Sequence, residues 1–140
     1  MDKRDLDILR ILEENSRATI AEIAKKLGIS ESNVRKRLRR MEENGVIRKY
    51  TVIEDPAKLG YSVIAILGFD TTPEKNIDVA KKLSEFDEVK RVLICSGSHT
   101  LVAEVWARSG EELSKLICQK YGKIDGITKV YTSIVLERIK

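Results

Sequence analysis

The feature that most constrains the fold is a very short connection between two amphipathic segments near the N-terminus. The first segment, TIAEIAKKL at 19–27, has apolar residues at helical spacing, and Thr19 with Glu22 resembles a capping box. Gly28 supplies a left-handed stop, and Ser30 offers a new N-cap immediately afterwards. Two helices separated by three residues cannot lie antiparallel side by side, so they must cross steeply. The sequence therefore predicts a helix-turn-helix, preceded by an amphipathic helix over 4–14.

The second helix of this pair contains the basic run SNVRKRLRR, residues 32–40. At about 100° per residue, Val34, Leu38 and Met41 share the side that faces the other two helices. Arg37 falls near the apolar boundary, where we expect it to snorkel. The opposite side presents a short polar end and then cations: Ser32, Arg35, Lys36 and Arg39, with Arg40 on its shoulder.

A helix of this shape fits the DNA major groove, where guanidinium forks reach guanine O6 and N7. The simpler interpretation is a solvated basic helix that binds nothing. Ala24, Gly28 and Ile29, at the spacing of a tight helix-turn-helix, count against it. Asn44-Gly45 ends this helix, and VIRKYTVI (46–53) alternates like a strand, which suggests a short wing with Arg48 and Lys49 near phosphates.

The charge balance and a break in regular structure divide the chain into two parts. Residues 1–54 carry 13 Lys and Arg against 10 Asp and Glu, whereas residues 55–140 carry 13 against 12. Asp55-Pro56 breaks regular structure, so we expect a domain over 1–54, a hinge over 55–61 and a second domain over 62–140.

The second domain contains an internal repeat with an offset of 38 residues. FDEVKRV (86–92) matches IDGITKV (124–130), and SVIAILGFD (62–70) matches TLVAEVWAR (100–108), with helical periodicity between these anchors. Each repeat reads strand, helix, strand. The fold class is therefore α+β: an N-terminal helix-turn-helix, winged-helix-like, followed by a ferredoxin-like βαββαβ sandwich.

The predicted strands are apolar on both sides. One side, which includes Leu67 and Leu101, is expected beneath the helices. The other side also carries apolar residues, expected to be Ile64, Ile66, Ile94, Val102, Trp106, Ile134 and Leu136. In a sheet that is covered on one face only, apolar and polar residues should alternate more regularly along each strand. We therefore expect a second copy of the chain on the open face, in an obligate homodimer.

The ordered combination resembles the Lrp/AsnC family of feast/famine transcription regulators. The residues that carry the resemblance are DLDILRILEENSR, IAEIAKKLGISESNVRKRLRRMEENGVI and DPAKLGY. It implies a sequence-specific regulator that binds double-stranded DNA, dimeric and often octameric, with an amino-acid effector in many members. By this likeness the DNA contacts are Ser30, Ser32, Asn33, Arg35, Lys36 and Arg39, to which Arg40 is added from the shoulder of the helix. Charged residues at 34% are typical of a heat-adapted source, and with the resemblance we expect an archaeal one.

The resemblance also implies an effector site in the loop SGSHT (96–100) and at the start of the last strand. Its candidate residues are Gly97, Ser98, His99, Thr100, Thr132 and Ser133. Many relatives have an Asp in this loop, which could hold an amino group, and this chain has none there. Glu104 is a candidate substitute. Two forms stay open: one modulated by a free amino acid and one that acts without a small ligand.

Other functions have less support. One His and no nucleophile–base pair argue against an enzyme, and His99 with Cys95 supplies too few ligands for a metal, so no cofactor is expected. The central strands lack the paired aromatics of an RNA-stacking sheet. A non-specific architectural protein that coats DNA is the open alternative. No apolar run spans a membrane, and Cys95 and Cys118 are expected to be buried thiols of a cytoplasmic protein.

Overall fold

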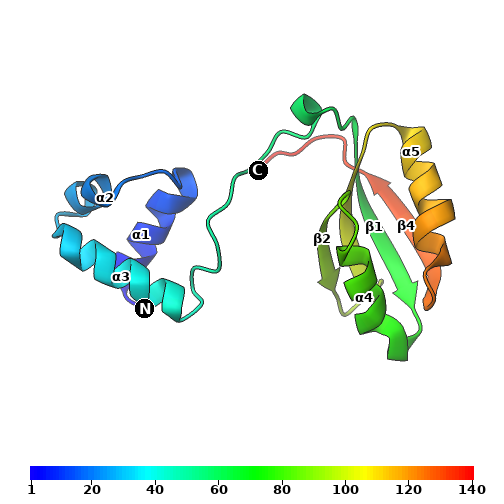
Figure 1. Ribbon diagram of the computed structural model, residues 1–140, viewed down its shortest axis with the longest axis horizontal. Coiled ribbons are helices and arrows are strands. Elements are labelled where there is room, and N and C mark those ends of the chain that lie inside the picture. The colour runs from blue at the N-terminus through cyan, green and yellow to red at the C-terminus, as the bar shows by residue number, and fades with distance from the viewer. The chain divides into compact units, whose positions relative to one another are not determined.

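The computed structural model describes residues 1–140, and the chain divides into two compact units, Met1–Glu54 and Asp55–Lys140 (Figure 1). No helix in either unit has the length and apolar character needed to cross a bilayer.

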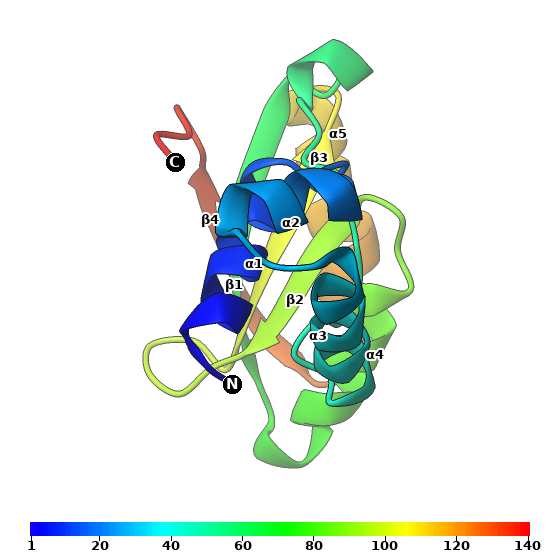
Figure 2. The same ribbon diagram turned by 90° about the vertical axis from the view of Figure 1, so that its left-hand side faces the viewer.

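The first unit contains three helices, α1 (Lys3–Glu14), α2 (Ile20–Leu27) and α3 (Glu31–Glu43) (Figure 2). The predicted caps are present. The Thr19 hydroxyl accepts the backbone N–H of Glu22, whose carboxylate accepts the N–H of Thr19. Gly28 has φ 64°, a left-handed conformation that only glycine adopts without strain. The Ser30 hydroxyl accepts the N–H of Asn33 and caps α3, so only three residues separate the end of α2 from the start of α3.

One small core holds these helices together. The predicted inner side of α3 is confirmed, because Val34 and Met41 are buried and Leu38 is half-buried. The buried residues of this core are Ile8, Ile23, Ala24, Val34 and Met41. The inner stripe of each helix is thus sequestered, and the polar side of α3 is left facing outward.

The prediction of a wing strand is wrong. Residues 46–53 form no strand, and almost all of them are exposed. A strand needs a neighbour that pairs its backbone N–H and C=O groups, and this segment has none within the chain.

The second unit is the predicted βαββαβ sandwich. Its elements are β1 (Val63–Thr71), α4 (Asn76–Ser84), β2 (Val89–Ile94), β3 (Leu101–Ala107), α5 (Gly110–Lys115) and β4 (Ile127–Ile134). The antiparallel sheet has the order β2-β3-β1-β4, and α4 and α5 lie on one side of it (Figure 1). A π-helical turn, Leu116–Lys120, continues α5.

The helix-covered face of the sheet is the core of this unit. Ala65, Leu67, Phe69, Leu101, Ala103, Val105 and Ala107 are all buried there. On the other face, which we call the open face, Ile66 is 37% exposed and Leu93 is 49% exposed. Tyr131 is also exposed on this face, opposite Gly68.

Two residues expected on the open face lie on the other side. Ile94 is opposite Leu101, and Ile134 is opposite Ala65, so both share the helix-covered face. A register shift between Val89 and Arg91, and another where β4 pairs with Asp70 and Thr71, reverse the alternation. The first shift also brings Leu93, which the sequence did not indicate, onto the open face.

Trp106 and the two cysteines have surroundings that the sequence did not indicate. Trp106 is only 8% exposed, because Tyr61 covers it at 5.6 Å between ring centroids and the Lys90 ammonium lies 5.0 Å from its ring. The prediction of buried cysteines is wrong: Cys118 is exposed on the π-helical turn, and Cys95 is half-buried just after β2.

Candidate nucleic-acid interface

The outward side of α3 is a polar and cationic surface. Arg35 and Arg39 have side chains that are 63% and 82% exposed. Each is paired only with a glutamate one turn along the helix, Arg35 with Glu31 at 3.3 Å and Arg39 with Glu43 at 3.9 Å. Exposed pairs of this kind contribute about 0.3–0.5 kcal/mol, so a phosphate or a base edge can replace the glutamate at small cost.

A groove of about 450 Å³ runs beside these residues. It is lined by Ser30, Ser32, Asn33, Lys36, Arg37 and Arg40. The structure therefore brings five of the seven predicted DNA contacts to one hollow and places Arg35 and Arg39 outside its lining. The Ser30 hydroxyl is already engaged, since it caps α3 and lies 3.1 Å from the Ser32 hydroxyl.

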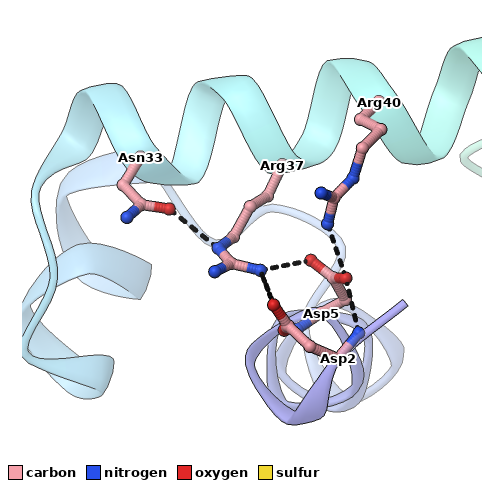
Figure 3. A network of polar contacts seen from close by, with 5 residues as sticks. All are labelled: Asp2, Asp5, Asn33, Arg37 and Arg40. Carbon is pink, nitrogen blue, oxygen red and sulfur yellow. Dashed lines mark hydrogen bonds and ion pairs between the residues drawn. The ribbon is translucent and has the colours of Figure 1, made fainter.

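Arg37 does not snorkel along the apolar boundary, as expected from the sequence, but is held by ion pairs (Figure 3). Its Nη1 donates to the carboxylates of Asp2, at 2.7 Å, and Asp5, at 2.8 Å, and its Nε donates to Asn33 Oδ1 at 2.7 Å. Arg40 Nη2 donates to the other oxygen of Asp5 at 2.7 Å. Two acids, the N-cap residue of α1 and one in its first turn, thus bind two cations of α3.

The charges of this network reinforce one another. Hydrogen bonding from Arg37 holds the pKa of the Asp2 carboxyl below its ordinary value. Burial by itself would raise the pKa of Asp5, but the Asp2 backbone N–H, the Arg37 guanidinium and the charge of Arg40 outweigh it, and the pKa is lowered. The same contacts raise the pKa of Arg37. Asp2, Asp5 and Arg37 are therefore ionised at neutral pH.

The segment that follows α3 keeps its cations in solvent. Arg48 and Lys49 are exposed. Tyr50 is tied back to α3, because its hydroxyl donates to Glu42 at 2.7 Å. Burial and this carboxylate raise the pKa of Tyr50 to about 12.

The predicted effector loop closes tightly against β1 in the second unit. The backbone N–H of Thr100 donates to the Phe69 carbonyl at 3.1 Å, and the N–H of Cys95 donates to the Thr100 carbonyl at 2.9 Å. The Thr100 hydroxyl lies 3.1 Å from that of Thr71. Gly97 and Ser98 are exposed at the tip of the loop.

The ring of His99 lies over Gly68, where a Cβ would come within 2.5 Å of its Cδ2 atom. Its Nδ1 is 3.3 Å from an Asp70 carboxylate oxygen, and its ring centroid is 4.3 Å from that of Tyr131. Sequence reasoning missed Asp70, whose carboxylate lies beside the loop from β1. Its polar side chain within an apolar strand was the signal that could have found it.

The remaining effector candidates are not all brought together. Ser133 is opposite Ile66 and therefore lies on the open face, whereas Thr132 is opposite Leu67 and lies on the helix-covered face. Glu104, the suggested substitute carboxylate, accepts a hydrogen bond from the Trp106 indole at 2.8 Å. The structure contains no cluster of three or more His, Cys, Asp or Glu that could hold a metal ion.

Comparisons with known proteins identify both units. Residues 1–48 match the family described as winged helix-turn-helix DNA-binding, and residues 64–140 match the Lrp/AsnC ligand binding domain. The HTH-type transcriptional regulator LrpA of Pyrococcus horikoshii is 51% identical over 140 residues, which is 100% of this chain and 99% of the relative. LrpA1 of Halobacterium salinarum is 38% identical, with 95% of this chain and 94% of the relative covered.

Solved structures agree with this result. AsnC of Escherichia coli has a TM-score of 0.89 at 29% identity, covering 100% of this chain and 95% of its own. A transcriptional regulator from Neisseria meningitidis, solved in complex with L-Met, has a TM-score of 0.92, covering 100% of this chain and 92% of its own. Its 23% identity shows the fold alone. The two domain matches and the full-length relatives place the chain in the Lrp/AsnC family of DNA-binding transcriptional regulators.

Proposed function

We propose that this regulator reads operator sequence through the outward side of α3, which enters the major groove. The observation that carries the proposal is the cationic, solvent-exposed side of a well-capped second helix in a helix-turn-helix. Arg35 and Arg39 are the candidates for guanine O6 and N7, because their guanidinium groups are exposed and only weakly paired. The other proposed contacts, to base edges or phosphates, are Ser30, Ser32, Asn33, Lys36 and Arg40.

A second copy of the chain is the proposed occupant of the open face. Exposed Ile66 and Leu93 on this face support the assignment, since water-exposed apolar strands favour association. A two-fold dimer would place two α3 helices in successive major grooves, about 34 Å apart, on a pseudo-palindrome. By family likeness, four such dimers would form an octamer.

The proposed effector is a free amino acid. Asp70 could accept its ammonium group, and the hydroxyl groups of Ser98 and Ser133 are candidates for its carboxylate. Screening the twenty amino acids at saturating concentration tests this, because a ligand that binds only the folded state raises the melting temperature. Loss of the shift in Asp70→Asn would support the site. No shift from any amino acid would favour a regulator that acts without a small ligand.

A footprint on genomic fragments, including DNA upstream of its own gene, tests the DNA proposal. The Arg35→Ala/Arg39→Ala variant is compared with Arg10→Ala/Arg17→Ala, which loses the same charge from the same unit outside α3. We expect discrete protected sites at helical-turn spacing that disappear with the first variant and persist with the second.

Two outcomes would contradict the DNA proposal. Uniform protection of all fragments would indicate the architectural, DNA-coating alternative. Discrete sites that survive the Arg35→Ala/Arg39→Ala change would show that another surface reads the bases.

A further inference from the structure

Asp5 of α1 binds the two arginines that line the groove beside α3. Its carboxylate is fully buried, with 0% exposure. One oxygen accepts from Arg37 at 2.8 Å, and the other accepts from Arg40 at 2.7 Å and from the Asp2 backbone N–H at 2.9 Å. A buried carboxylate between two guanidinium groups holds both in one orientation, because its oxygens cannot move without losing these bonds.

Neither arginine has used all its donors. Arg37 contacts Asp2, Asp5 and Asn33 through Nη1 and Nε, and its Nη2 has no hydrogen-bond partner. Arg40 is bonded only through Nη2 and is 49% exposed. Both side chains line the groove together with Lys36. Figure 3 shows the two guanidinium groups held side by side above Asp5, with nitrogen atoms left over on each.

We propose that Asp5 is a positioning residue for DNA recognition: it fixes Arg37 and Arg40 so that their unused N–H groups meet a phosphate oxygen of the operator. The inference rests on the proposed DNA contact by α3 and adds Arg37 to that surface. Asp2 is exposed and makes a smaller contribution, because it binds Arg37 but not Arg40. An arginine that is already fixed loses less side-chain freedom on binding than one free in solvent.

The sign of the effect separates positioning from simple electrostatics. A carboxylate near DNA repels phosphates, so electrostatics alone predicts that removing Asp5 strengthens binding. Positioning predicts the opposite, weaker binding, because a phosphate contact is lost. Asp7 provides the matched control, because it lies on the same helix and pairs with Arg10 rather than with either groove arginine.

The experiment compares wild type, Asp5→Asn and Asp7→Asn on an operator found by footprinting and on a scrambled duplex, at several salt concentrations. For Asp5→Asn we expect operator affinity to fall about tenfold and the salt slope to fall by about one, as when a phosphate contact is lost. Because a phosphate contact carries no base information, affinity for the scrambled duplex should fall by a similar factor. Asp7→Asn should bind the operator as tightly as wild type or more tightly.

Two further variants cover the case in which Asp5→Asn does not fold. Asp2→Asn changes an exposed group that holds Arg37 and should weaken operator binding relative to wild type, by less than about tenfold. Arg40→Lys keeps the charge but loses the planar guanidinium group that Asp5 orients, and should lower affinity for both duplexes.

Equal or tighter operator binding by folded Asp5→Asn would overturn the inference and identify Asp5 as a counter-ion that masks the arginines. If that variant is unfolded, unchanged binding by Asp2→Asn and Arg40→Lys would overturn it. Failure of wild type to select any site would instead refute the proposed function.

Discussion

Ile66→Asp provides a direct test of the proposed homodimer. Ile66 lies on the central strand β1, and its cross-strand neighbours on the open face are Glu104 and Ser133. A new carboxylate at this position would therefore have no cation directly beside it. The matched control is Ile77→Asp, because Ile77 is 60% exposed on α4, which lies on the other side of the sheet.

The magnitude follows from the exposure of Ile66. Complete burial of an isoleucine contributes about 1.5–3 kcal/mol, and 37% of this side chain is still exposed in the single chain. Covering the remainder in a dimer would contribute about 1–2 kcal/mol for two copies. Burying two unpaired carboxylates costs at least about 2–6 kcal/mol in total, because this range holds for neutral polar groups and an ionised group costs more. The dimer dissociation constant should rise at least about 100-fold.

Sedimentation velocity over a range of protein concentrations measures this change, with circular dichroism to establish that each variant is folded. Wild type and Ile77→Asp should sediment as dimers or larger assemblies at concentrations where Ile66→Asp is monomeric. Equal assembly of Ile66→Asp and wild type would refute the assignment of the open face to a second copy.

Three further predictions concern single groups. The pKa values of Asp2 and Asp5 are lowered in the folded chain, so both carboxylates stabilise the fold fully above the unfolded pKa of about 4, and this stabilisation is lost as the pH falls below it. Melting curves between about pH 2 and 7 should show the melting temperature falling in acid. The fall should be smaller for Asp5→Asn. Tyr50 should ionise near pH 12 in an ultraviolet titration, and Glu42→Gln should lower that pKa because the hydroxyl loses a charged acceptor; an unchanged value would contradict the contact. Gly68→Ala should displace the His99 ring, since the new Cβ would lie 2.5 Å from it; the imidazole NMR signals of the only histidine should then lose the ring-current shift from the neighbouring tyrosine, and an identical spectrum would refute this packing.

Local signals in the sequence predicted the three helices of the first unit, although not the segment 46–53 that follows them. Thr19, Gly28 and Ser30 act on their own helix ends through contacts four residues away or fewer, so their roles follow from spacing alone. The contacts between Asp5 and the two arginines span 32 and 35 residues. Such contacts depend on how α1 packs against α3, which no local pattern encodes.

In the second unit, the sequence predicted the order of elements but not the register of every strand. The repeat identified βαββαβ because each strand and helix has its own periodicity. The faces of Ile94 and Ile134 were wrong because one extra residue in a strand reverses all later alternation. Asp70 was missed because its neighbour His99 is 29 residues away in sequence and adjacent only across the sheet.

The central claim is that α3 reads base sequence, and Arg35 tests it most directly. Every base pair of a protected operator is substituted in turn, and binding by wild type and Arg35→Ala is measured for each duplex. We predict that the variant loses roughly 1–3 kcal/mol and its preference at one base pair, while its preferences elsewhere stay unchanged. A uniform loss across all duplexes would make Arg35 a phosphate contact, and no loss at all would contradict the assignment of this side of α3 to DNA.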